Sequence, residues 1–302
     1  MKLGAVSSLL WLACLGPAAG QDFSEIKVER VADKLLFAEG PVWAPEGFLL
    51  FCDVPGNRIM KFAGGGASAA FRENSKGTQG LAFDSQGRLY ACESHARRVT
   101  RTDKKGKIEV LAERFEARRL NAPNDIAVRH DNQVYFSDPA FGKQMDSREL
   151  SFFGVYHVTP KGELEVIARP KGRPNGVALS PNGKTLYVAN SDEKRIYRYD
   201  LDRSGAASNE RVLISGIEGV PDGLKTDEKG NLYIAAKAVL IYTPEGKLIR
   251  EVPVPEKPSN LAFGDADLES LYVTARTSVF RFRVPVKGWS IERTPERPPD
   301  SR

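Results

Sequence analysis

The chain has 302 residues, of which 41% are hydrophobic and 27% charged, a balance that excludes disordered and collagen-like proteins. Its 44 Lys and Arg residues against 39 Asp and Glu give a net charge of +5. The basic residues are dispersed, and the longest run, at 104–107, reads as a solvated turn, so no nucleic-acid partner is expected. The 27 Gly and 19 Pro residues indicate many tight turns.

The first twenty residues have the pattern of a secretory signal peptide. Lys2 precedes an apolar stretch at 9–15 that is too short to span a bilayer, and small residues at 18–20 suit a cleavage site. We therefore expect residues 1–20 to be removed and the mature protein to be secreted or periplasmic. Lipid anchoring at Cys14 is disfavoured because the residues before it match a lipidation site poorly. No second apolar stretch reaches membrane length, so no membrane span is expected.

A similar unit occurs six times in the remaining chain. Each copy starts with a small residue and an apolar pair, continues through a polar turn, and ends in an apolar run. The copies are GPVWAPEGFLLFCDV, GLAFDSQGRLYACES, NDIAVRHDNQVYFSD, NGVALSPNGKTLYVANS, DGLKTDEKGNLYIAA and NLAFGDADLESLYVTA, with first strands marked by Val42, Leu81, Ile126, Val177, Leu224 and Leu261. These markers lie 37 to 51 residues apart, which is near the length of one propeller blade.

Third and fourth strands can be placed in most units. Third strands are predicted at 58–62, 99–102, 155–158, 196–199, 239–242 and 279–283, and fourth strands at 69–72, 108–112, 164–168, 211–214 and 248–252. The sixth unit has no obvious fourth strand, and the alternating segment at 25–31 could fill that place and close the ring. The predicted fold is all-β, with residues 21–302 forming one six-bladed β-propeller domain. A two-sheet sandwich, the alternative, does not explain six similar units.

The residue just before each opening small residue is polar in every unit. These six residues are Glu39, Gln79, Asn124, Asn175, Asp222 and Ser259. First strands line the channel of a propeller, so the six side chains are expected to form a ring at its mouth. Converging carboxylates and amides are costly to desolvate unless a cation lies among them, and oxygen ligands suit Ca²⁺, Mg²⁺ or Mn²⁺, with Zn²⁺ not excluded. The simpler alternative is that these residues only cap strands and solvate the channel.

The motifs EGPVW at 39–43, NAPND at 121–125, RPNG at 173–176 and PDG at 221–223 resemble the gluconolactonase and regucalcin (senescence marker protein) family. The resemblance covers nearly all of the mature chain and is closest to the bacterial gluconolactonase-like branch. It implies one divalent metal ion bound by Glu39, Asn175 and Asp222, a substrate contact from Asn124, and an acid/base role for Asp222. Animal members have an Arg two positions before that Asn, where this chain has Ala122, and this departure puts sugar-lactone specificity in doubt.

The resulting hypothesis is a metal-dependent hydrolase that opens lactones. The metal would act as a Lewis acid, and a water associated with it would be the nucleophile. The expected partner is a small lactone or ester. The alternatives are a non-catalytic propeller that binds a protein or carbohydrate, and other metal-dependent chemistry on sugar acids at the same site. The physiological substrate, the native metal and the oligomeric state are left open by the sequence.

Several residues outside this ring are secondary candidates. The ends of the second strands carry a second set of polar residues, Asp53, Glu93, Asp138, Ser191, Lys237 and Arg276, which read as ordinary loop charges or as walls of the substrate pocket. Asp138 is the best functional candidate among them, and His95 could approach the pocket. Cys52 and Cys92 could form a disulfide or remain as buried thiols. Recurring tyrosines, including Tyr90 and Tyr233, are expected to pack between blades.

Overall fold

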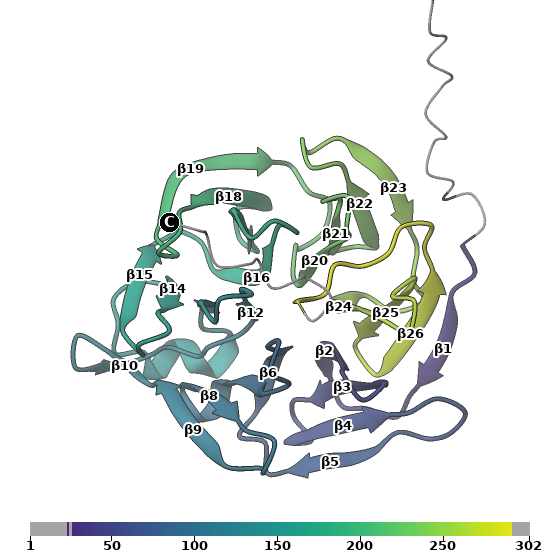
Figure 1. Cartoon of the computed structure of the whole chain (residues 1–302), viewed down its shortest axis with the longest axis horizontal. Coiled ribbons are helices and arrows are strands. Elements are labelled where there is room, and N and C mark those ends of the chain that lie inside the picture. Colours follow the sequence, from purple (N-terminus) through teal and green to yellow (C-terminus); the bar gives the residue numbers. More distant parts are fainter. Residues whose placement is uncertain (1–22, 24–25, 292–302) are drawn as a thin grey trace, which may run out of the picture.

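The computed structural model of the protein describes residue 23 and residues 26–291 and is a six-bladed β-propeller (Figure 1). Residues 1–20, the predicted signal peptide, lie outside the described residues. Six first strands surround the channel, namely β2 (Ala38–Ala44), β6 (Thr78–Phe83), β12 (Ile126–Val128), β16 (Pro174–Leu179), β20 (Leu224–Thr226) and β24 (Pro258–Gly264). The six strands contain the six marker residues, so the predicted fold class is confirmed.

The outer strands follow in sequence order within each blade. Second strands are β3 (Phe48–Asp53), β7 (Leu89–Glu93), β13 (Val134–Asp138), β17 (Thr185–Asn190), β21 (Leu232–Ala235) and β25 (Ser270–Ala275). Third strands are β4 (Arg58–Phe62), β8 (Arg98–Thr102), β14 (Gly154–Val158), β18 (Arg195–Leu201), β22 (Val239–Tyr242) and β26 (Ser278–Arg283). Fourth strands in the first five blades are β5 (Ala69–Glu73), β9 (Ile108–Ala112), β15 (Leu164–Ala168), β19 (Ala207–Ile214) and β23 (Leu248–Val252).

The N-terminal strand completes the sixth blade. Strand β1 (Glu29–Ala32) pairs antiparallel with β26, so this blade has the order β1-β26-β25-β24. Glu29 lies opposite Arg281 and accepts a hydrogen bond from its guanidinium at 2.5 Å. The predicted closure is therefore confirmed. Strand β1 supplies the fourth strand of the sixth blade and covers the edge of β26.

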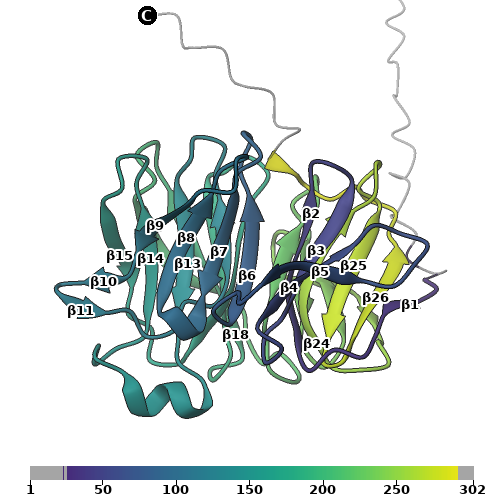
Figure 2. The ribbon, with the colours of Figure 1, turned by 90° about the horizontal axis from the view of Figure 1, so that it is seen from below.

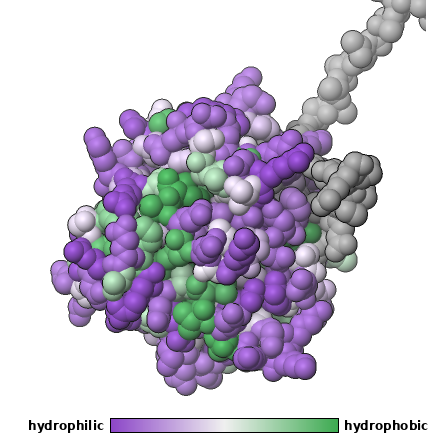
Figure 3. All heavy atoms as spheres, turned by 60° about the vertical axis from the view of Figure 1, so that its left-hand side comes forward, coloured by the Kyte–Doolittle hydropathy of each residue, from purple (hydrophilic) through white to green (hydrophobic). Residues whose placement is uncertain are grey.

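Three short insertions were not predicted from the sequence. These are the 3-10 helices η1 (Ser94–Ala96) and η2 (Gly142–Ser147), and a hairpin formed by β10 (Arg114–Phe115) and β11 (Arg118–Arg119). Figure 2 shows η2 at one end of the channel and the C-terminal part of the described chain at the other. The surface turned forward in Figure 3 is mainly hydrophilic, with apolar residues gathered near its middle.

The core lies between blades and is anchored by a repeated tyrosine. Tyr90 and Tyr233 are fully buried, as predicted for inter-blade packing. Each tyrosine donates a hydrogen bond from its hydroxyl to an aspartate at the end of the preceding strand, at 3.0 Å to Asp84 and 3.2 Å to Asp227. Those aspartates also accept backbone N–H groups of their hairpin turns. The polar end of each buried ring is thereby satisfied within its own blade.

The two cysteines are free and buried. Cys52 lies on β3 and Cys92 on β7, and no disulfide joins them. Burial in an apolar environment raises the pKa of both thiols well above the usual range. The sequence left open a disulfide or two buried thiols, and the structure has two buried thiols.

Gly40 gives a sharp test of how closely the blades approach at the channel. It has φ of +43°, and a Cβ atom there would collide with the carbonyl oxygen of Gln79 in the next blade. We expect Gly40→Ala to lower the free energy of unfolding by about 3 kcal/mol. Gly47→Ala is the control, because Gly47 also has a positive φ but a Cβ there meets nothing within 4 Å, so about 1 kcal/mol is expected. Urea unfolding measures both, and equal losses would contradict the steric explanation.

Candidate functional site at the channel mouth

The six predicted ring residues lie at or just before the start of the first strands. Glu39, Asn124, Asn175 and Ser259 are buried, whereas Gln79 and Asp222 are partly exposed. Because every first strand runs along the channel in the same direction, these positions share one end of it (Figure 1).

Hydrogen bonds between neighbouring blades join these positions. The N–H of Gly80 donates to the carbonyl of Asn124 at 2.6 Å, that of Gly176 to Asp222 at 3.2 Å, and that of Gly223 to Ser259 at 2.8 Å. Ser259 donates from its hydroxyl to the carbonyl of Ala38 at 2.7 Å, which connects the sixth blade to the first. The glycines are needed here because a Cβ at Gly176 or Gly223 would collide with the next blade. The structure therefore brings the predicted ring together.

Asn175 is held with its amide oxygen free. Its Nδ2 donates to the hydroxyl of Ser191 at 3.1 Å, and that hydroxyl donates to the carbonyl of Pro221 at 2.9 Å. Its Oδ1 is buried and has no hydrogen-bond partner among the described residues. Leaving such an oxygen unpaired costs free energy unless a ligand satisfies it.

Glu39 and Asp222 are two carboxyl groups in a poorly hydrated environment. Burial is the main cause that raises the pKa of Glu39 to about 7. Burial, followed by the charge of Glu39, raises the pKa of Asp222 well above its usual range, while Lys257 opposes this shift. The charge of Glu39 therefore disfavours ionisation of Asp222, and Asp125 disfavours ionisation of both, which is the electrostatic condition that a cation relieves.

These donors fit a divalent cation. Two carboxylates and an unpaired amide oxygen are the hard ligands that Ca²⁺ and Mg²⁺ prefer. Across residues 26–291 and residue 23, no group of three or more His, Cys, Asp and Glu side chains could hold a metal ion. The Glu39, Asp222 and Asn175 set is not such a group, because its third donor is an amide.

Asn124 belongs to a polar chain that leads away from the ring. It donates from Nδ2 to Oε1 of Gln79 at 2.9 Å, and Gln79 donates to the hydroxyl of Ser94 in η1 at 3.1 Å. Gln144 of η2 donates to the same hydroxyl at 2.9 Å. Helix η2 is thus tied to the side of the channel mouth. Sequence reasoning missed Ser94 and Gln144, because no local pattern indicates that these two helices meet.

Asp125 is a further residue that the sequence reasoning missed. It is buried directly after Asn124, and its carboxylate accepts the N–H groups of Ile126 at 3.0 Å and of Val177 in the next blade at 3.1 Å. The sequence did contain a signal for Asp125. Four of the six blades have glycine directly after the ring residue, so a different residue at that position is unusual. The exceptions are Asp125 and Asn260, and the Asn260 side chain fills the space beside Gly223.

The second set of polar residues is mainly structural. Asp53 is fully buried and accepts the N–H groups of Leu36 and Phe37 and a guanidinium hydrogen bond from Arg58. Glu93 is buried and accepts hydrogen bonds from Arg98 at 2.6 Å and from Thr100 at 3.1 Å. Ser191 orients Asn175, as described above. Lys237 and Arg276 are exposed.

Asp138, the best candidate of this set, holds the loop that carries Asn124. Its two carboxylate oxygens accept the N–H groups of Asn121 at 2.8 Å and Ala122 at 2.7 Å. Burial raises the pKa of this fully buried carboxyl to about 7, against the effect of those two hydrogen bonds. Ala122 therefore contributes its backbone N–H to this clamp.

Removing that clamp is expected to loosen the mouth. Asp138→Ala leaves two buried N–H groups without an acceptor, so we expect a loss of about 3 kcal/mol in the free energy of unfolding. Asp200→Ala removes a partly exposed carboxylate bonded to Arg211 and should cost much less, because solvent screens such a pair. Chemical denaturation compares the two variants, and a similar small loss for Asp138→Ala would exclude the clamp.

The histidines do not reach the ring. His95 is exposed and its imidazole lies against Gly77. His157 is buried, hydrogen-bonds to Gln133 and Glu165, and stacks on Tyr135 with ring centres 5.0 Å apart. His130 is exposed in its turn. No imidazole therefore accompanies the carboxylates of the mouth.

A cavity lies toward the opposite mouth of the channel. It has a volume of about 660 Å³ and is lined by the far ends of the first strands, including Trp43, Phe83 and Phe263. The ring and this cavity are separate features, and the carboxylate and amide chemistry belongs to the ring.

Together the fold and the ring define a β-propeller with a buried acidic and amide-bearing mouth. Residues 37–277 match the family model described as the SMP-30/gluconolactonase/LRE-like region. The chain therefore belongs to this gluconolactonase-like family. The resemblance seen in the sequence is confirmed.

Individual relatives agree with this assignment. The chain is 30% identical to a gluconolactonase of Zymomonas mobilis, over 86% of this chain and 82% of that protein. A solved gluconolactonase of Xanthomonas campestris is 30% identical, with a TM-score of 0.80 and coverage of 87% of this chain and 90% of the other. A calcium-binding regucalcin of Agrobacterium tumefaciens shares the fold, at 24% identity, a TM-score of 0.73, and coverage of 84% and 92%.

Within the described part of the chain, no helix is long and apolar enough to cross a membrane.

Proposed function

We propose that this protein hydrolyses lactones with one divalent metal ion held by Glu39, Asn175 and Asp222. The observation that carries the metal proposal is the buried Oδ1 of Asn175, which has no hydrogen-bond partner among the described residues. The same mouth has the buried carboxyl group of Glu39 and the partly exposed one of Asp222. Family membership supports the lactone as substrate class. A divalent cation bound there would supply Lewis-acid polarisation of the ester carbonyl and charge stabilisation in the transition state.

The side chains of the mouth have distinct tasks in this reaction. Asp222, partly exposed to the channel, accepts a proton as water attacks the carbonyl carbon. As the ring C–O bond breaks, Asp222 returns that proton to the leaving oxygen, so protons balance over one turnover. Asn124 orients the substrate, and its own amide is fixed by Gln79. Asn175 and Glu39 position the site without proton transfer.

A pH-stat assay tests this function on aldonolactones and simple aryl esters. We expect lactone opening that stops after chelation and returns with Ca²⁺, Mg²⁺, Mn²⁺ or Zn²⁺. The panel also ranks substrates, which matters because the family resemblance leads us to expect an Arg where this chain has Ala122. Metal binding without turnover on any lactone or ester would overturn the hydrolase assignment and favour other chemistry on sugar acids. Absence of both metal binding and turnover would favour a non-catalytic binding propeller.

We further propose that the protein acts after export, in the periplasm or outside the cell. Support comes from the charged, apolar and small-residue pattern of residues 1–20. Mass spectrometry of the protein recovered from a secreting host should give Gln21 as the N-terminus. An intact Met1 or Lys2 N-terminus on the recovered protein would contradict the proposal.

A further inference from the structure

The cavity at the far mouth of the channel is built differently from the ring. Its walls come from the ends of first strands that begin at the ring, such as β2 from Ala38 to Ala44. Its lining begins at Pro41, two residues after Glu39, and continues past the end of the strand at Ala44, so the cavity follows the ring along the channel. Its volume of about 660 Å³ is within the range of small-molecule sites.

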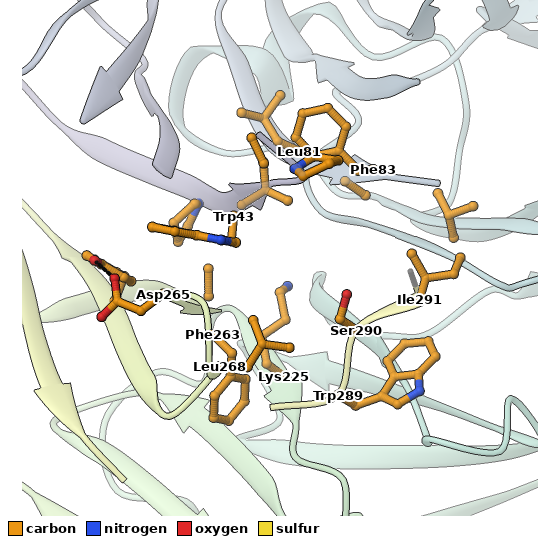
Figure 4. Close-up of a pocket in the computed structure, with 18 of the residues that line it drawn as sticks. Trp43, Leu81, Phe83, Lys225, Phe263, Asp265, Leu268, Trp289, Ser290 and Ile291 are labelled. Carbon is orange, nitrogen blue, oxygen red and sulfur yellow. Dashed lines mark hydrogen bonds between the residues drawn. The ribbon is translucent and has the colours of Figure 1, made fainter. Parts of the chain in front are cut away.

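A C-terminal segment forms one wall of this cavity. Residues 284–291 leave β26 and cross toward the channel axis (Figure 1). Backbone hydrogen bonds fix the segment, from Gly288 to the carbonyl of Leu268 at 2.8 Å and from Trp289 to that of Thr226 at 3.2 Å. Trp289 and Ile291 then line the cavity together with Trp43 and Phe83 (Figure 4). An apolar hollow with anchored walls is typical of a binding site.

One cationic group points into this apolar space. Figure 4 shows Lys225, on β20, reaching between the wall with Trp43 and Phe83 and the wall with Trp289 and Ile291. The nearest carboxylate is Asp125, with its Oδ2 4.0 Å from Nζ, which is beyond hydrogen-bond distance. Asp125 already accepts two backbone N–H groups. The ammonium makes no hydrogen bond to any described residue.

Of the other charged residues that line the cavity, Asp265 and Arg281 face each other, and Glu46 is an exposed carboxylate. Asp265 accepts hydrogen bonds from Tyr272 at 2.8 Å and from Ser270, and lies 3.6 Å from Arg281. Lys225 is therefore the group through which the cavity can recognise an anionic ligand by charge. A carboxylate suits an ammonium that has free donors, since such charge-assisted hydrogen bonds are strong away from bulk water.

We propose that this cavity is a second site, which binds a small carboxylate with a bulky apolar body. The carboxylate bonds to Lys225, and the apolar body packs between the two tryptophan-bearing walls. The proposal does not rest on lactone hydrolysis, although the charge of Lys225 also acts on Glu39 of the ring. The chemistry of the cavity also differs, since a polyhydroxylated lactone would leave its hydroxyl groups without partners against these apolar walls.

Tryptophan fluorescence reports on this site selectively. The chain has three tryptophans, of which Trp11 belongs to the predicted signal peptide, and both Trp43 and Trp289 line the cavity. The probes are 4-cyclohexylbutyrate and its neutral amide, 4-cyclohexylbutyramide, which have the same apolar body and do not absorb with tryptophan. We expect saturable binding of the carboxylate and at least tenfold weaker binding of the amide.

Variants identify the residue responsible. Lys225→Met should remove the preference for the carboxylate, while Lys225→Arg should retain it. Lys287→Met, which removes an exposed lysine from the same C-terminal segment, should leave the preference unchanged. Equal affinity of the wild-type protein for both probes would overturn the proposal, and this comparison does not depend on the folding of any variant. A preference that survives in folded Lys225→Met would overturn it as well.

Binding at the metal ring is the other way to capture a carboxylate. Carboxylate binding that is abolished by a chelator, or that competes with a lactone substrate, would place the probe at the ring and overturn the second site. Binding that persists in the chelated protein supports the far mouth, even if the protein fails to hydrolyse any lactone. The outcomes of the two proposals are thus distinguishable.

Discussion

Asp222→Asn is expected to lower kcat/KM for lactone opening by at least about 10³-fold. Asparagine keeps the shape of the side chain but cannot accept a proton from water, and it also weakens the cation site by one charge. General-base contributions of 10²- to 10⁴-fold, together with a weakened cation site, set this magnitude. Initial rates on the best lactone of the panel, at saturating metal, give the measurement.

The stability of the same variant separates chemistry from misfolding. In the metal-free protein, Glu39 and burial both disfavour the ionised form of Asp222, which raises its pKa. A neutral amide removes that repulsion, so metal-free Asp222→Asn should be at least as stable as the wild type at pH 8. Asp267→Asn, at an exposed carboxylate bonded to Arg283, should leave the rate unchanged. Wild-type activity in Asp222→Asn would remove this residue from the mechanism.

Chelation at pH 8 is expected to lower the Tm by roughly 10 °C. A ligand present at about a thousand times its Kd stabilises the folded state by about 4 kcal/mol, and a propeller of this size gains some 2–4 °C per kcal/mol. The measurement is thermal unfolding between pH 5 and pH 8, with chelator or with a 1 mM excess of each cation.

The pH dependence follows from the raised pKa of Glu39. In the folded metal-free state this pKa is about 7, against 4.5 for an ordinary glutamate. The folded state thus holds a proton that the unfolded chain releases, so the associated stability is present below about pH 4.5 and is lost as the pH rises to about 7. A cation favours the ionised form, and its stabilising effect should grow over the same range and be small at pH 5.

Glu39→Gln is the matched control for this experiment. Its metal-free Tm should vary less between pH 5 and pH 8 than that of the wild type. Asp138, whose pKa is also raised to about 7, is present in both proteins and cancels in the comparison. The metal-induced shift in Tm should largely disappear in Glu39→Gln. A wild-type Tm that is equal with and without cations at pH 8 would exclude the site.

The sequence by itself determined the number of blades, the closing strand and the ring positions. A blade is formed by strands that follow one another, so its pairing is local and repeats as a pattern of apolar residues and turns. Val42, Leu81 and the other markers fall in the six first strands for this reason. An equivalent position in each repeat must occupy an equivalent place around the axis. For this reason Glu39 and Asn175 could be assigned to the same ring although they are 136 positions apart in the sequence.

Only the tertiary structure shows which polar side chains already have hydrogen-bond partners within the protein. The sequence left open whether Asp53, Glu93 and Asp138 are loop charges or walls of the pocket. In the structure, backbone N–H groups and neighbouring side chains donate hydrogen bonds to their carboxylates. Asn175 differs because Ser191 takes its Nδ2 and leaves its Oδ1 free. Hydrogen-bond satisfaction depends on the distance and direction of groups from other segments, which residue order does not specify.

The two ends of the channel also differ in how far the sequence predicts them. The polar mouth was predictable because each repeat supplies one polar residue at the same position. The far cavity, with Lys225 between Trp43 and Trp289, depends on a C-terminal segment that crosses the channel after the last repeat. That segment has no counterpart in the other blades, and its position is set by contacts with Leu268 and Thr226. The sequence repeat predicts the features that every blade shares. The contacts of the C-terminal segment occur once, and they form only in the closed ring.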